Sequence, residues 1–169
     1  MNAPAPRVLV AGVGNIFLRD DGFGVEVVRR LHAQPLPDGV KLVDFGIRGV
    51  HLAYELLDGY DALVLIDAAP HGQQPGTVSL LEPNMATLPD SPATIGVVDA
   101  HGMEPTSVFS LLASLDQVPA RTLIVACEPA DTGDGMGLSE PVAAAVDPAA
   151  ELVRTLLHRD PDLLVTTED

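Results

Sequence analysis

The chain has 169 residues and a formal net charge of −15, with nine lysines and arginines against 24 aspartates and glutamates. This length fits a single domain over residues 1–169 that buries a full hydrophobic core. The acidic excess argues against a nucleic-acid partner, because binding nucleic acid requires lysines and arginines that neutralise phosphates.

Membrane and export signals are not evident in the sequence. No apolar run approaches the roughly 20 residues that a membrane-spanning helix needs. The first residues, MNAPAPR, lack the charged and apolar regions of a signal peptide. The only cysteine, Cys127, rules out an internal disulfide and fits a reducing compartment. The sequence therefore predicts a cytoplasmic protein without a membrane partner.

Apolar strands and amphipathic helices follow one another along the chain. In order, the pattern predicts strand 7–15, helix 22–34, strand 40–46, helix 50–60, strand 61–70, strand 76–83, helix 104–115, strand 121–129 and helix 140–158. Residues 83–98 are expected to form a long irregular connection, and residues 159–169 a frayed tail beyond a core of about 7–158. Such alternation is typical of an α/β fold, a three-layer α/β/α sandwich with a mostly parallel sheet.

Polar residues follow the predicted strands, and in such sheets ligands bind beyond the carboxyl ends of the strands. These strand-end residues are Gly12, Gly14, Asn15, Asp20, Asp21, Asp44, Gly46, Asp67, Asp99, His101, Cys127 and Glu128. A dinucleotide fingerprint beginning at Gly12 fails, because Phe17 stands where its third glycine belongs. Two aspartates before the next helix would also repel a phosphate. No nucleotide cofactor is therefore expected.

A metal cation suits the residues at these strand ends better than a nucleotide does. Asp21, Asp67 and His101 would supply two carboxylates and one imidazole from three strand ends, a donor set that fits a first-row divalent metal with open positions. Taken singly, each residue has a simpler interpretation. Asp21 would cap a helix, Asp67 would belong to a turn, and His101 would lie in a surface loop. The residues alone leave both interpretations open.

Four motifs add a more specific indication. GVGNIFLRDDGFG, LVLIDA, DAHGMEPTSVFSLL and GMGLSEPV occur in this order between about residues 7 and 157. Together they resemble the hydrogenase maturation endopeptidases of the HyaD, HybD and HycI type. The resemblance implies a twisted five-stranded sheet in an α/β/α sandwich. It also implies a peptidase that cuts the C-terminal extension from the large-subunit precursor of a nickel–iron hydrogenase after nickel insertion.

The resemblance also assigns site residues. It places the metal ligands at Asp21, Asp67 and His101, where they would grip the nickel of the precursor, and it makes Asp21 and Asp67 the catalytic aspartates. The family often has glutamate at the position of Asp21. The second-strand loop, often D-G-G-T in the family, here reads DFGIRG. Asp44 and Gly46 are retained in this loop and are expected to contribute to substrate binding.

The neighbouring loop residues have expected roles of their own. Gly12 and Gly14 are expected to let the backbone turn sharply after the first strand, and the Asn15 side chain to hold that turn by hydrogen bonds to nearby backbone. Asp20 is expected to cap the following helix or to lie in solvent. His71 is expected in an exposed turn, with a role as a spare ligand as the alternative.

The expected mechanism is guided by the nickel of the substrate, with attack by a water that the metal polarises or an aspartate deprotonates. Cys127 is expected to be a small buried residue rather than a nucleophile. Two alternatives remain. A chaperone that binds the large subunit without cutting it would use the same ligands. A peptidyl-tRNA hydrolase shares the strand and glycine turn, although the acidic charge argues against it.

Overall fold

The computed structural model describes residues 7–47, 49–82, 119 and 121–159. Its elements, in chain order, are β1 (Val8–Val13), η1 (Arg19–Gly22), α1 (Phe23–Leu31), β2 (Val40–Gly46), α2 (Gly49–Leu56), β3 (Ala62–Ala68), β4 (Val78–Leu81), β5 (Arg121–Cys127) and α4 (Glu140–Arg159). The predicted helix 104–115, the connection 83–98 and most of the tail lie outside the described residues. The short 3-10 helix η1 was not predicted.

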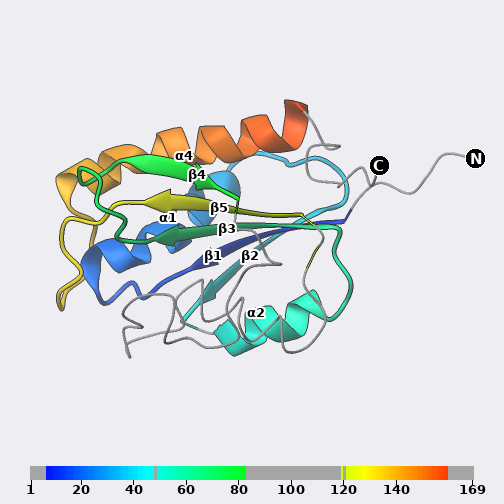
Figure 1. Cartoon of the computed structure of the whole chain (residues 1–169), viewed down its shortest axis with the longest axis horizontal. Helices are drawn as coiled ribbons and strands as arrows, with labels where there is room; N and C mark the ends of the chain where they lie inside the picture. The colour runs from blue at the N-terminus through cyan, green and yellow to red at the C-terminus, as the bar shows by residue number, and fades with distance from the viewer. Residues whose placement is uncertain (1–6, 48, 83–118, 120, 160–169) are drawn as a thin grey trace, which may run out of the picture.

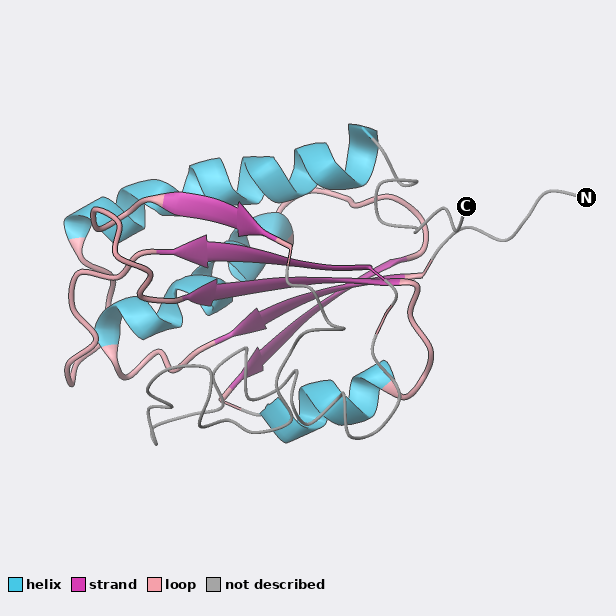
Figure 2. Ribbon diagram, in the orientation of Figure 1, coloured by secondary structure: helices cyan, strands magenta, loops and turns pink. Residues whose placement is uncertain are grey.

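The strands form one five-stranded sheet in the order β2-β1-β3-β5-β4. β1 pairs in parallel with β2 and β3, and β3 pairs in parallel with β5, whereas β4 runs antiparallel to β5. The arrowheads of the four parallel strands point to the same end of the molecule, opposite to that of β4 (Figure 2). The prediction of a mostly parallel sheet is therefore confirmed, and β4 is its antiparallel edge.

Helices cover both faces of the sheet, which confirms the three-layer sandwich (Figure 1). In β1, Val8 and Val10 pack into the core beneath α1 and α4. The alternate residues Leu9 and Ala11 pack into a second core beneath α2. Every residue of β3 is buried, as expected of a central strand covered on both sides. None of the described helices combines the length and apolar composition that crossing a bilayer requires.

This topology brings the loops after β1, β2, β3 and β5 to one edge of the sheet. Helix α1 presses against that edge, since a Cβ atom on Gly24 would lie 2.3 Å from the carbonyl oxygen of Ile66 and 2.4 Å from that of Val13. The carboxyl ends of β1 and β3 are thus held tightly together, and the strand-end residues meet here.

Candidate active site

Gly14 lies at the centre of this edge. Its φ of +137° is one that L side chains rarely adopt, and a Cβ atom there would lie 1.8 Å from the carbonyl oxygen of Asp21. The same Cβ position is 3.7 Å from Oδ1 of Asp67. The backbone of Asp21 and the carboxylate of Asp67 therefore both approach this one glycine, which leaves no room for a larger residue.

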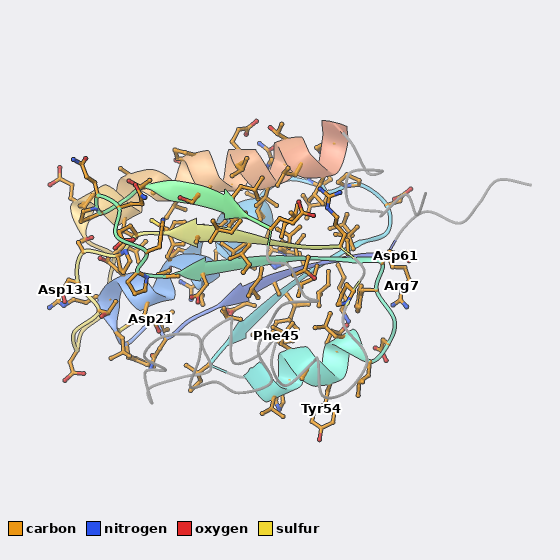
Figure 3. The ribbon with its side chains drawn as sticks, viewed as in Figure 1. Arg7, Asp21, Phe45, Tyr54, Asp61 and Asp131 are labelled. Carbon is orange, nitrogen blue, oxygen red and sulfur yellow. The ribbon has the colours of Figure 1, made fainter. Side chains whose placement is uncertain are left out.

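Asp21 comes from the loop after β1, in η1, and is half-buried. The backbone N–H of Asn15 donates to its Oδ2 at 2.8 Å. The Asn15 side chain folds back on the same loop, because its Oδ1 accepts from the backbone N–H of Phe17 at 2.9 Å. Figure 3 shows Asp21 at the end toward which the parallel strands run. The loop therefore fixes the position of the Asp21 carboxylate.

Asp67 occupies the next-to-last position of β3, opposite Ala126 of β5. The residue is only 6% exposed. Buried carboxylates are rare because an ionised group loses its hydration, so such a position is typical of a residue with a specific partner or a chemical role.

Asp44 and Gly46 lie at the carboxyl end of β2, at the same edge of the sheet. The backbone N–H of Gly46 donates to Oδ1 of Asp44 at 2.8 Å, and Gly46 has a φ of +55°. The N–H of Gly14 donates to the carbonyl of Gly46 at 2.9 Å. This bond ties the β2 loop to the β1 loop beside the two aspartates. Phe45 is buried beneath α2, whereas Ile47 is exposed.

His101, the third predicted metal ligand, lies outside the described residues, as does Asp99. Within the described ranges, no three side chains of His, Cys, Asp or Glu come together as a metal-binding group. The ligand set of Asp21, Asp67 and His101 therefore stays a prediction.

Gly12 differs from its expected role in the turn. It lies within β1, and a Cβ atom there would lie 2.5 Å from both the Gly24 carbonyl oxygen and a methyl group of Val28. Gly12 is thus required by the close approach of helix α1 to the strand, and the sharp turn depends on Gly14.

Asp20 neither caps helix α1 nor lies in solvent, so both expectations for it were wrong. It is fully buried and accepts four hydrogen bonds from the loop between β5 and α4. The donors are the backbone N–H groups of Ala130 and Asp131, each at 2.8 Å, and the N–H and hydroxyl of Ser139 at 2.6 and 2.8 Å. Burial alone would raise the pKa of the Asp20 carboxyl, but these hydrogen bonds outweigh it and hold the pKa below its ordinary value.

His71 also differs from the expected exposed turn. Its side chain is only 21% exposed. The ring atom Nδ1 lies 3.0 Å from Oε2 of Glu128 and 2.7 Å from the carbonyl oxygen of Ala69. The other ring nitrogen, Nε2, lies 3.1 Å from Oγ of Ser79. Because the carbonyl and the ionised carboxylate only accept, Nδ1 carries the proton in the neutral ring and Nε2 accepts from Ser79. A serine nucleophile of the G-x-S-x-G type lies on a sharp turn between a strand and a helix. Ser79 instead lies within β4 and pairs with β5. We interpret these three residues as a structural link between the ends of β3, β4 and β5.

Replacement of Gly14 by alanine is expected to disrupt the edge, because the new Cβ overlaps the Asp21 carbonyl. Gly59→Ala is a matched control, since Gly59 also has positive φ (+85°) but nothing within 4 Å of its Cβ position. In urea denaturation, Gly59→Ala is expected to cost about 1 kcal/mol and Gly14→Ala at least about 2 kcal/mol more. Equal losses in the two variants would show that the Asp21 backbone does not confine Gly14.

Cys127 is fully buried at the end of β5, as the sequence predicts. Burial, together with the carboxylates of Asp20 and Glu128, raises the pKa of its thiol to about 11. The reactive thiolate is therefore scarce at neutral pH. Native protein is expected to resist alkylation by iodoacetamide until it unfolds, and Cys127→Ala to keep the activity of the wild type within about twofold. Rapid alkylation of native protein with loss of activity would instead make Cys127 a candidate nucleophile.

Comparison with known proteins agrees with the motifs. The sequence model of the hydrogenase maturation protease family (HycI) matches residues 25–156. The chain is 34% identical over 159 residues to the hydrogenase expression/formation protein HupD of Rhizobium leguminosarum bv. viciae, covering 92% of this chain and 76% of that protein. It is 32% identical over 158 residues to the hydrogenase 2 maturation protease of Escherichia coli (strain K12), covering 90% and 91%.

A solved structure agrees as well. The hydrogenase maturating endopeptidase HybD from E. coli superposes with a TM-score of 0.76 at 30% identity, covering 91% of this chain and 93% of HybD. Motifs, family model, relatives and fold therefore indicate one and the same family.

Proposed function

Because the chain belongs to the hydrogenase maturation protease family and is therefore a peptidase, we propose that it removes the C-terminal extension of the large-subunit precursor of a nickel–iron hydrogenase. Cleavage follows insertion of nickel, and the nickel of the precursor is the recognition element. We place the reaction in the cytoplasm, since a single cysteine fits a reducing compartment.

The observation that carries this proposal is the approach of Asp67 and Asp21 to Gly14. The carboxylate of Asp67 lies 3.7 Å from the Cβ position of Gly14, and the Asp21 carbonyl crowds the same position. Two aspartates on adjacent strand ends of a parallel sheet supply oxygen ligands where such folds bind their ligands. Carboxylates together with an imidazole suit a nickel ion, and an acidic edge binds poorly to a precursor that lacks the cation.

In the proposed reaction, Asp21, Asp67 and His101 grip the nickel that the precursor holds, and this places the scissile bond at the carboxyl edge of the sheet. A water polarised by that nickel, or deprotonated by one of the aspartates, attacks the scissile carbonyl carbon. The peptide C–N bond breaks, the leaving amine takes a proton, and the new carboxyl group stays on the large subunit. Asp44 and Gly46 contact the substrate beside this point.

The test is incubation of the wild-type protein with a nickel-loaded precursor and with the same precursor lacking nickel, followed by mass spectrometry. Release of a C-terminal peptide from the loaded form alone is expected. Equal release from both forms would overturn the role of nickel. Nickel-dependent binding without any release would identify a chaperone.

A further inference from the structure

The loop that joins β5 to α4, residues 128–139, lies against the turn that carries Asp21. Asp20, which directly precedes Asp21, is fully buried and accepts four hydrogen bonds from this loop, each between 2.6 and 2.8 Å. Its backbone N–H also donates to the carbonyl of Asp131 in the same loop at 3.0 Å. Both the side chain and the backbone of Asp20 are therefore bound to a segment more than 100 positions further along the chain. Figure 3 shows Asp131 at the same end of the molecule as Asp21.

The residues that precede Asp20 are bound to the same loop. The N–H of Arg19 donates to the carbonyl of Gly135, and the N–H of Gly135 donates to the carbonyl of Phe17, each at 2.9 Å. The guanidinium of Arg19 lies beside this glycine, where a Cβ atom would lie 3.0 Å from Cζ. The segment between Phe17 and Asp20 is thus joined to the β5–α4 loop by backbone hydrogen bonds as well as by side chains.

Arg19 has an unfavourable backbone conformation that this loop enforces. Among the residues that the structure describes, it is the one residue other than glycine with positive φ, at +49°. Such a conformation persists only where surrounding contacts hold it, and it is typical of functional positions. The bond from Arg19 to Gly135 and the bond from the next residue, Asp20, to Asp131 supply these contacts. The unusual φ sets the direction in which the chain enters η1, and Asp21 follows two residues later.

Two sets of hydrogen bonds place Asp21. Within its own loop, Oδ2 of Asp21 accepts from the N–H of Asn15 at 2.8 Å, and its backbone N–H donates to the carbonyl of Leu18 at 3.1 Å. These bonds fix Asp21 relative to its loop, whereas the bonds of Asp20 fix that loop relative to the end of β5. Because β5 also pairs with β3, which carries Asp67, the end of β5 is a common support for both aspartates of the candidate site.

We propose that Asp20 is a positioning residue for the cleavage reaction, and that the β5–α4 loop, through Asp20, holds the Asp21 carboxylate in a fixed place relative to that of Asp67. Asp20 is fully buried, so it acts on the reaction through Asp21 and not by contact with the substrate. This inference rests on the proposed function, in which Asp21 and Asp67 bind the nickel of the precursor together. The loss of a group that holds a metal ligand in place commonly lowers activity by about 10- to 100-fold.

The test is steady-state cleavage of the nickel-loaded precursor by wild type, Asp20→Asn, Ser139→Ala and Ser139→Thr, each checked by circular dichroism to be folded in the assay. Ser139→Ala removes the hydroxyl that donates to Asp20 and keeps the N–H, whereas Ser139→Thr keeps both donors. Asp20→Asn is expected to lower kcat/KM by about 10- to 100-fold and Ser139→Ala by about fivefold, with Ser139→Thr within about twofold of wild type. Asp134→Asn is the matched control, since Asp134 is an exposed aspartate of the same loop, and a change of less than about twofold is expected.

The possible outcomes separate this inference from the proposed function. If Asp20 only stabilised the fold, folded Asp20→Asn and Ser139→Ala would unfold at lower urea concentrations but would have the kcat/KM of Asp134→Asn. That result would overturn the positioning role, although the proposed function would stand. If Asp20→Asn does not fold, the Ser139 variants decide, because equal kcat/KM in Ser139→Ala and Ser139→Thr contradicts the inference. A wild type that releases no peptide overturns the proposed function and this inference with it.

Discussion

Asp20→Asn is expected to lower the free energy of unfolding by about 3 to 5 kcal/mol, one of the largest effects of any single substitution in this chain. The carboxylate accepts three hydrogen bonds at Oδ2 and one at Oδ1, all from the loop between β5 and α4. Asparagine keeps one acceptor and places an NH₂ group against N–H donors. Even with its carbonyl oxygen at the Oδ2 position, the NH₂ group faces the Ser139 N–H, which loses its acceptor, and the three remaining hydrogen bonds lose a charged acceptor. Urea denaturation at neutral pH measures the loss.

Asp131→Asn is the control for this substitution. Asp131 lies in the same loop, but its side chain is exposed and its backbone carbonyl, which accepts from the Asp20 N–H, is unchanged. Its effect is expected to stay within about 0.5 kcal/mol. If Asp20→Asn were as mild as this control, the buried carboxylate would not hold the loop.

The stabilisation by Asp20 is also expected to depend on pH. Its pKa in the folded protein lies below the ordinary value of 3.8, so the folded state favours the ionised form. The contribution is therefore complete well above pH 3.8 and is lost as the pH falls through the lower pKa of the folded state. The difference in stability between wild type and Asp20→Asn should shrink in this acid range.

Asp67→Asn is expected to lower kcat for precursor cleavage by at least about 100-fold. The substitution keeps the size of the side chain but removes the negative charge from a buried position at the end of β3. Both proposed roles of Asp67, as a ligand of the nickel and as a base toward water, depend on that charge. Cleavage is measured with the nickel-loaded precursor, and the fold is checked by circular dichroism.

Asp61→Asn is the matched control, since Asp61 directly precedes β3, whereas Asp67 is near the carboxyl end of that strand. Figure 3 shows Asp61 at the end of the molecule opposite to Asp21. The carboxylate of Asp61 accepts from the backbone N–H of Arg7 at 2.7 Å, far from the candidate site. Activity within about twofold of wild type is expected for Asp61→Asn. An Asp67→Asn protein with more than a tenth of the wild-type kcat would remove Asp67 from the chemistry.

The general architecture was predictable because it follows from local patterns. The apolar runs in β1, β3 and β5 mark buried parallel strands, and parallel strands carry their following residues to one edge. That rule alone selected the region where Gly14 and Asp67 approach each other. The antiparallel direction of β4 was not predictable, because a short apolar strand has the same pattern in either direction.

The roles of individual polar residues were harder to predict because their partners are distant in the sequence. Asp20 and Asp21 are adjacent and chemically identical, yet Asp20 is bound by residues more than 100 positions away, whereas Asp21 is bound by Asn15 of its own loop. His71 likewise gains its partners from β4 and from the end of β5. Such contacts depend on packing, which no local pattern reveals. Nothing in the sequence of the glycine-rich segment that precedes α4 indicates that this segment binds Asp20.

The most direct test of the central claim is nickel K-edge X-ray absorption on a loaded precursor whose scissile bond resists cleavage. Spectra are recorded for the precursor alone, with the wild-type protein and with Asp67→Asn. If the two aspartates bind the substrate's nickel, the wild-type protein adds oxygen or nitrogen neighbours to the first shell of the metal, and Asp67→Asn adds fewer. An unchanged nickel environment in the complex with wild type, under conditions where a cleavable precursor is cut, would contradict this assignment.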